Sequence, residues 1–230
     1  MANDIVLMMS IAVSLMIIAL LFYVDRIFRV SVSDFWETEA IETPITLALG
    51  LVILAIILSM INIGIVSSPI PIDMNVTGVL IPLVVSVYIV LSRRVKARSA
   101  LFSIITVSAI TFPLASVTMN GISIALFLWL LPVSISALLG YLLGKTKEPM
   151  SVASLAYLSA SMGMLIGGDL ANIPNFISSG GSSLILGAGG LMDFVFLAGP
   201  FSVAILWGVL GAWMTIKKRT RFRFIVPKRG

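Results

Sequence analysis

The chain of 230 residues contains no cysteine and no histidine. The first absence excludes disulfides and thiol chemistry, and the two together exclude haem ligation and the usual zinc and copper sites. Without histidine, proton transfer near neutral pH must depend on carboxylates, Lys, Tyr or water. Any bound metal would be a hard cation held by oxygen atoms.

Charge is also scarce. Charged residues make up 11% of the chain and hydrophobic residues 59%, with a mean hydropathy of +1.14. Uncharged stretches of about 20 residues, the length that a helix needs to cross a bilayer, recur along the whole sequence. The composition therefore predicts an all-α integral membrane protein, multi-pass in the plasma membrane, with the lipid bilayer as its first partner.

Seven predicted spans account for this pattern. The turn-prone Thr118-Met119-Asn120-Gly121 divides the charge-free run 99–144, which is too long for one helix, into two spans. We expect a seven-helix membrane domain over residues 1–216, followed by a basic tail over 217–230. The predicted spans are about 5–24, 44–62, 76–92, 99–117, 122–143, 150–168 and 193–215.

The positive charges predict how the chain is oriented across the membrane. All 15 Lys and Arg fall on one side of a seven-span chain: after the first span, between the third and fourth, between the fifth and sixth, and in the tail. By the positive-inside rule that side is cytoplasmic, so the N-terminus lies outside and the C-terminus inside. The tail suits the anionic inner leaflet, and no nucleic-acid partner is expected.

The segment 162–194 departs from simple spanning helix. It holds eight of the 18 glycines together with Asp169 and Asp193, each flanked by uncharged sequence. A carboxylate at a bilayer boundary is costly and is therefore a candidate functional residue. An eighth span within 170–192 would place the basic tail opposite the other basic residues. We therefore expect a Gly/Ser-rich re-entrant or capping segment there.

Both aspartates also have an ordinary structural interpretation. Asp169 follows Gly167-Gly168 at the end of the sixth predicted span, where it could close the helix in a hydrated turn. Asp193 could cap the last helix. Because consecutive spans usually pack together, the two carboxylates could instead share an outward-facing pocket. Further candidates for binding in that pocket are Asp73, Asn75 and Asn172, and the expected structural glycines are Gly167, Gly168, Gly187, Gly189 and Gly190.

Two facing carboxylates support two kinds of chemistry. They can hold a cation or a proton, which makes our leading hypothesis cation- or proton-linked binding and transport of an ion or small solute at Asp169 and Asp193. Na⁺, Ca²⁺ and Mg²⁺ all fit such a site, and no other cofactor is expected. They can also activate water, so the alternative is an intramembrane aspartyl hydrolase with both residues catalytic. A third hypothesis is a non-catalytic membrane subunit whose glycines serve helix packing.

Three short elements resemble a prokaryotic multi-pass membrane family, the domain of unknown function 1614. The elements are Asn75 to Pro82, Gly167-Gly168-Asp169-Leu170 and Gly187 to Asp193, and the resemblance covers about residues 60–215. The chain departs from that family at Thr77, Met192 and Phe194. The resemblance implies no activity, but it links the two aspartates as a pair.

A weaker resemblance is to intramembrane aspartyl proteases, at Ile166-Gly167-Gly168-Asp169. The first glycine of their Gly-x-Gly-Asp motif is missing here, and the chain has neither a Tyr-Asp pair nor Pro-Ala-Leu.

Overall fold

The computed structural model of the chain describes residues 54–68, 70–125, 127–144 and 149–223, with side chains described as far as Val209. These residues belong to one compact unit, Gly50–Gly230. The first predicted span, most of the second and the last seven residues of the tail lie outside the described residues.

Helices dominate the described part of the chain. Two helical runs, Ala97–Leu114 and Pro149–Ser178, are long and apolar enough to cross a membrane. The α-helices are α3 (Ile81–Leu91), α4 (Ala97–Thr111), α5 (Leu130–Leu143), α6 (Pro149–Met164), α7 (Ile173–Ser178) and α8 (Phe194–Arg223). The shorter helical turns are η1 (Val76–Leu80), η2 (Phe112–Leu114), η3 (Leu165–Asp169), η4 (Leu170–Asn172) and η5 (Gly190–Met192).

Helix α6 lies at the centre of this body and contacts α3, α4, α5 and α8. Its small residues allow this position because they let neighbouring backbones approach closely. Ser159 and Ala160 are fully buried, and Gly163 lies directly against Val107 of α4. Leu155 and Leu158, two of the largest fully buried side chains of the core, come from the same helix.

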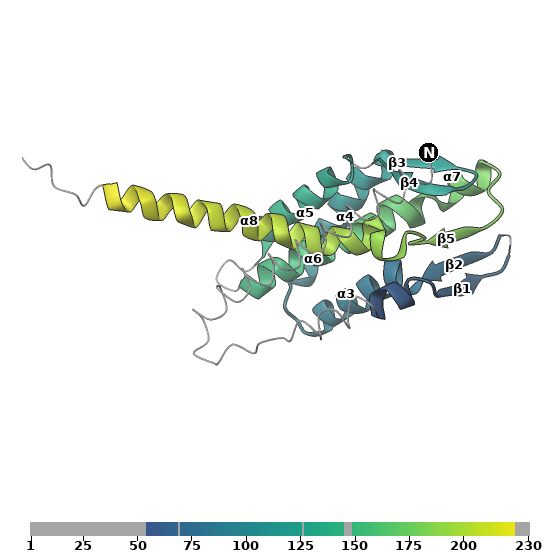
Figure 1. The fold of residues 1–230 in the computed structure, drawn as a ribbon, viewed down its shortest axis with the longest axis horizontal. Helices are drawn as coiled ribbons and strands as arrows, with labels where there is room; N and C mark the ends of the chain where they lie inside the picture. Colours follow the sequence, from purple (N-terminus) through teal and green to yellow (C-terminus); the bar gives the residue numbers. More distant parts are fainter. Residues whose placement is uncertain (1–53, 69, 126, 145–148, 224–230) are drawn as a thin grey trace, which may run out of the picture. The chain divides into compact units, whose positions relative to one another are not determined.

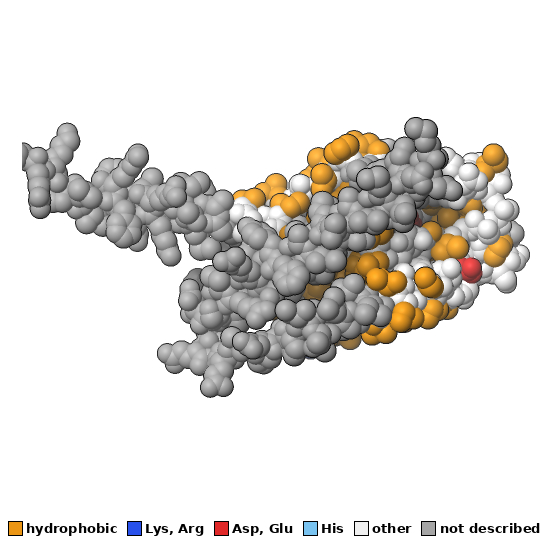
Figure 2. Space-filling view, viewed as in Figure 1, with side chains coloured by type: hydrophobic (Ala, Val, Ile, Leu, Met, Phe, Trp, Pro, Cys, Tyr) orange, Lys and Arg blue, Asp and Glu red, His pale blue; other side chains and the backbone are white. Residues whose placement is uncertain are grey.

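The helices around α6 carry many exposed hydrophobic side chains, and Figure 2 shows such side chains in orange over the described part of one face. Single exposed apolar residues are normal on soluble proteins, but continuous apolar helix faces indicate contact with lipid or protein. The surface therefore agrees with the composition in indicating a helical membrane protein. Exposed examples are Val84, Val87, Tyr88, Leu91, Leu101, Phe102, Ile105, Leu138 and Leu142.

The prediction of an all-α chain is wrong at one end of the body, where the connections form strands. A three-stranded sheet has the order β1-β2-β5, with β1 and β2 antiparallel and β2 and β5 parallel. A separate antiparallel hairpin joins β3 and β4. Figure 1 shows both sheets at the same end, called here the strand end. The strands are β1 (Asn62–Val66), β2 (Ile72–Asn75), β3 (Ala115–Thr118), β4 (Gly121–Ile124) and β5 (Leu184–Leu186).

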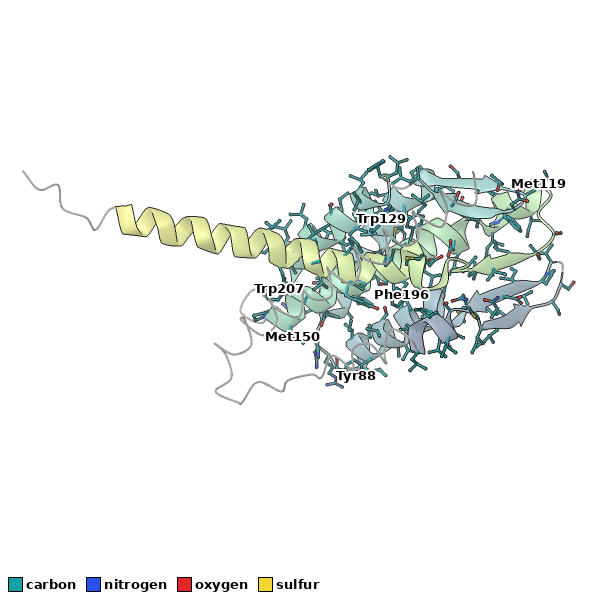
Figure 3. All side chains as sticks on the ribbon, in the orientation of Figure 1. Tyr88, Met119, Trp129, Met150, Phe196 and Trp207 are labelled. Atoms are coloured by element: carbon teal, nitrogen blue, oxygen red, sulfur yellow. The ribbon has the colours of Figure 1, made fainter. Side chains whose placement is uncertain are left out.

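The helices run alternately away from the strand end and back to it. Figure 3 shows Met119 of the β3–β4 turn at the strand end, whereas Tyr88 of α3, Met150 of α6 and Trp207 of α8 lie towards the opposite end. The basic residues from Arg93 to Arg98 lie between the end of α3 and the first turn of α4, so they lie at that opposite end. Among the described residues, these basic side chains and the strand end therefore lie at opposite ends of the body.

The structure also corrects the limits of the predicted spans. The predicted turn Thr118–Gly121 is confirmed, but it closes the β3–β4 hairpin rather than joining two helices. Strand pairing satisfies the backbone groups on both sides of the turn, so the fourth predicted span becomes strand at Ala115 and α5 begins only at Leu130. The sixth predicted span does not end at Gly168, because helical structure continues to Ser178. The segment 170–192 contains η4, α7, β5 and η5.

Candidate functional site

Asp169 lies in the π-helical turn η3, where α6 reaches the strand end. Such a widened turn is frequent at functional sites and leaves carbonyl groups without their usual helical partners. The buried Asn172 amide donates to two of these carbonyls, those of Gly167 (3.1 Å) and Gly168 (3.0 Å). Gly167 has no room for a side chain because it lies against the backbone of Ser108. The turn is thus held on two sides, and it carries the half-buried Asp169.

Asp193 directly precedes α8 and caps it. Its Oδ1 atom accepts a hydrogen bond from the Val195 backbone N–H at 2.8 Å, and its Oδ2 atom accepts a longer one from the Gly189 N–H at 3.3 Å. Asp193 is therefore a helix-initiating aspartate, as its structural interpretation predicts. Asp193 is also half-buried, and its bond from Gly189 shows that the carboxylate has a partner outside α8.

The two aspartates line the same two cavities. The smaller cavity has a volume of about 30 Å³, and the larger one about 370 Å³. Both are also lined by Ile122, Ser123 and Phe194. A space of 30 Å³ admits a water-sized group, whereas the larger volume is in the range of small-molecule sites. The two carboxyl groups are close enough to interact electrostatically. Because both residues line both cavities, they lie where the small cavity adjoins the larger one.

Gly187 connects this pair to the sheet. Its backbone N–H donates a hydrogen bond to the Asp169 carboxylate. Its φ of +69° belongs to the left-handed region, and its backbone touches that of Gly78 in η1, so neither glycine has room for a side chain. Gly190 also has a positive φ, 56°, and lies against Ser59. These glycines bring η1, β5 and η5 together around the carboxylates.

The comparison with known families bears on these same elements. The family described as "Protein of unknown function (DUF1614)" matches residues 45–205. The chain belongs to this family. No curated protein and no solved structure matches it. Membership of the DUF1614 family therefore confirms the predicted resemblance and assigns no reaction.

The three elements on which the DUF1614 resemblance depends come together in space. Asn75 to Pro82 contributes Gly78, which touches Gly187, and Gly187 donates to Asp169. The run from Gly187 ends at Asp193, which shares the cavities with Asp169. Elements that are well separated in the sequence thus form one site.

Three predicted pocket residues do not line either cavity. Asp73 lies in β2, opposite Gly64 of β1 and Ile185 of β5. The amide of Asn75 is buried and used internally: it accepts from the N–H groups of Thr77 (3.0 Å) and Gly78 (2.9 Å) and donates to the Ser59 carbonyl (2.7 Å). The Asn172 amide is used in the same way within η3. Both asparagines support the site without lining it.

Sequence reasoning missed two hydroxyl groups. Ser123 of β4 lines both cavities, and Ser183 lines the larger one, together with Asn120. Ser183 ends the Ser-Ser-Gly-Gly-Ser-Ser run, which in the sequence predicts only a Gly/Ser-rich re-entrant or capping segment. Ser123 carried no signal beyond its place after the Asn120-Gly121 turn, because an isolated serine in an apolar span usually bonds to its own helix.

The donor set limits what the site can bind. The described residues contain no group of three or more His, Cys, Asp or Glu side chains that could hold a metal ion. Two carboxylates and nearby hydroxyl or carbonyl oxygens could still hold a hard cation such as Na⁺, Ca²⁺ or Mg²⁺. They could equally hold one water molecule between them. No Lys or Arg is among the residues that line the two cavities.

Proposed function

We propose that Asp169 and Asp193 form an aspartyl dyad that activates water to hydrolyse an amide bond in a substrate held in the larger cavity. The observation that carries this proposal is the water-sized compartment of about 30 Å³ that both carboxylates line. A dyad needs two carboxyl groups that share one proton and contact one water molecule. A compartment of this size beside a larger cavity suits that arrangement better than a permeation path.

The surroundings suggest a role for each carboxylate. Asp193 accepts two backbone hydrogen bonds at the N-terminus of α8, and both the bonds and the helix dipole favour its charged form. Asp169 accepts one such bond, from Gly187. We therefore assign Asp193 as the general base and Asp169 as the carboxyl group that carries the shared proton.

The reaction balances without a cofactor. The Asp193 carboxylate takes a proton from water while the water oxygen forms a bond to the substrate carbonyl carbon. The Asp169 carboxyl group then gives its proton to the amide nitrogen as the carbon–nitrogen bond breaks. The products are a carboxylic acid and an amine, and transfer of the proton from Asp193 to Asp169 restores the starting state.

The proposed setting is a seven-span protein of the plasma membrane. The strand end lies opposite the basic connection 93–98, so the positive-inside rule would put the dyad at the outer face. Full-length protein in lipid nanodiscs and a synthetic peptide library, with products read by mass spectrometry, provide the test. We expect cleavage by the wild type and a loss of at least about 10³-fold in Asp169→Asn and Asp193→Asn, because each variant removes one half of the dyad.

Cation- or proton-linked transport is the second candidate. It is favoured by the two carboxylates in cavities whose lining residues include no Lys or Arg. Under this alternative, Na⁺, Ca²⁺ or Mg²⁺ raises the Tm of the wild type but not of the two Asn variants, and no peptide is cleaved. If cleavage, Tm and cation response are all the same in wild type and variants, the third hypothesis, a non-catalytic subunit, is correct.

A further inference from the structure

The larger cavity lies between two strand edges that have no strand partner among the described residues. Residues of β4 and of β5 line it, but none of β3 or β2 does. Because β4 pairs only with β3 in its sheet, and β5 only with β2, the unpaired edge of each strand is the one on the cavity side. Figure 1 shows the hairpin and the three-stranded sheet at the strand end, with β4 and β5 as the neighbouring strands of the two.

The hydrogen bonds of β5 support this orientation. The Leu184 N–H donates to the Pro71 carbonyl at 3.0 Å, towards β2. Backbone groups alternate in direction along a strand, so those of Ile185 point away from β2. The Gly187 N–H, two residues further on, donates to Asp169. The unpaired groups of β5 therefore face the side on which the dyad lies.

Both edges also lack the usual protection. Exposed strand edges commonly carry charged residues or proline, which prevent unwanted pairing with another chain. Gly121–Ile124 and Leu184–Leu186 contain neither. Unprotected edges beside a cavity are typical of proteins that bind a ligand as an added strand.

We propose that the substrate is an extended polypeptide segment that adds as a strand against β5, within reach of β4, and presents one peptide carbonyl to Asp169 and Asp193. This inference rests on the proposed hydrolytic function and gives it a substrate class. A cavity of about 370 Å³ holds a short extended segment, and three residues of a strand span ~10 Å. Main-chain hydrogen bonds supply the affinity in such binding, and the pockets for alternate side chains supply the selectivity.

The lining indicates which side chains the segment carries. Ile122, Leu186, Met192 and Phe194 form an apolar wall, and the carboxylates would disfavour acidic side chains. We therefore expect the residues next to the cleaved bond to be apolar and uncharged, as in a membrane-spanning or membrane-adjacent segment. A small solute or a bare ion would use the carboxylates but neither strand edge.

A matched pair of proline variants tests the use of the β5 edge. Ile185→Pro removes an N–H from the cavity-side edge and leaves the bonds to β2 in place. Ile65→Pro is the control: it lies on β1, at the other edge of the same sheet, where the pairing is irregular between Gly64 and Val66. The two residues are similarly exposed, at 38% and 51%, and proline is tolerated at edges and bulges.

Full-length wild type and variants are compared in nanodiscs for the initial rate of cleavage of the best peptide from the library, with Tm as the check on folding. We expect Ile185→Pro to lower the rate at least tenfold and Ile65→Pro to stay within twofold of the wild type. The same peptide is also N-methylated at each backbone nitrogen in turn, which needs no change in the protein. Methyl groups at alternate positions should abolish cleavage, as expected when every second N–H bonds to an edge.

The outcomes separate the two proposals. If cleavage depends on both aspartates but is indifferent to Ile185→Pro and to every N-methyl group, strand addition is overturned and the hydrolytic dyad stands. If Ile185→Pro unfolds the protein, the N-methyl series on the wild type decides. If no aspartate-dependent cleavage of any peptide occurs, both proposals are overturned together.

Discussion

Two kinds of polar side chain are buried or half-buried at the strand end, and they serve different purposes. The amides of Asn75 and Asn172 are each 2% exposed and are bonded on every side to the chain's own backbone and to other asparagines. The carboxylates of Asp169 and Asp193 accept few bonds and open on shared cavities. The difference separates polar groups that are hydrogen-bonded within the fold from polar groups that face a cavity, whereas the sequence alone had placed all four in one pocket.

The amides should account for the largest effects on stability. Asn75→Ala would leave the N–H groups of Thr77 and Gly78 and the Ser59 carbonyl without partners, and Asn172→Ala would do the same to the carbonyls of the π-helical turn. Buried unsatisfied groups are costly, so we expect each variant to lose about 2–4 kcal/mol of unfolding free energy. Thermal or denaturant unfolding in detergent measures this loss.

The exposed Asn120 provides the control, and Asn120→Ala should change the unfolding free energy by less than about 0.5 kcal/mol. If Asn75→Ala or Asn172→Ala has the Tm of the wild type but loses activity, the division between supporting and reacting groups is contradicted.

Gly187 lies between the two kinds of residue, because its conformation is structural and its N–H reaches Asp169. Gly187→Ala must place a side chain at φ +69° and against Val79, so we expect a loss of about 1–3 kcal/mol and a fall in activity as Asp169 loses its partner. Gly208 of α8 has open space around it. Gly208→Ala should be neutral or stabilising by up to about 1 kcal/mol, as alanine favours helix. Equal effects of the two variants on Tm would show that Gly187 is not constrained.

The carboxylates should show the smallest effect on stability and the largest on function. Asp169→Asn removes the repulsion between the two carboxylates. We expect its unfolding free energy to differ from that of the wild type by less than about 1 kcal/mol, although hydrolysis is lost. Asp193→Asn keeps an oxygen that can cap α8, since asparagine is as good a cap as aspartate. If either variant fails to fold, the carboxylates belong with the amides as structural groups.

The dependence of the rate on pH would sharpen the assignment further. A dyad works only when one carboxyl group is ionised and the other is protonated. We therefore expect a bell-shaped dependence of kcat/KM on pH, whose two apparent pKa values belong to the pair and not to either residue alone. A rate that rises to a plateau with increasing pH would instead show that hydrolysis needs only an ionised group, which would contradict the shared proton.

Much of the helical body could be predicted from the sequence, because an uncharged apolar run allows few structures in a bilayer. The end of α3 and the start of α6 fall close to the predicted spans, and the turn at Thr118–Gly121 is where the residues indicated. The strands could not be predicted in the same way. Short apolar runs such as Ile122 to Ile124 suit helix and strand equally, and only pairing with β3 decides between them.

The sequence by itself determined the strongly apolar, mainly helical character of the chain and singled out two carboxylates in apolar surroundings, since composition and local pattern need no tertiary partner. Only the tertiary structure decided which polar residues share a site. Asn75, Asn172, Asp169 and Asp193 are alike in the sequence, as polar residues in apolar surroundings. Their roles differ because the Gly78–Gly187 contact and the π-helical turn of α6 enclose the amides and leave the carboxylates facing a cavity.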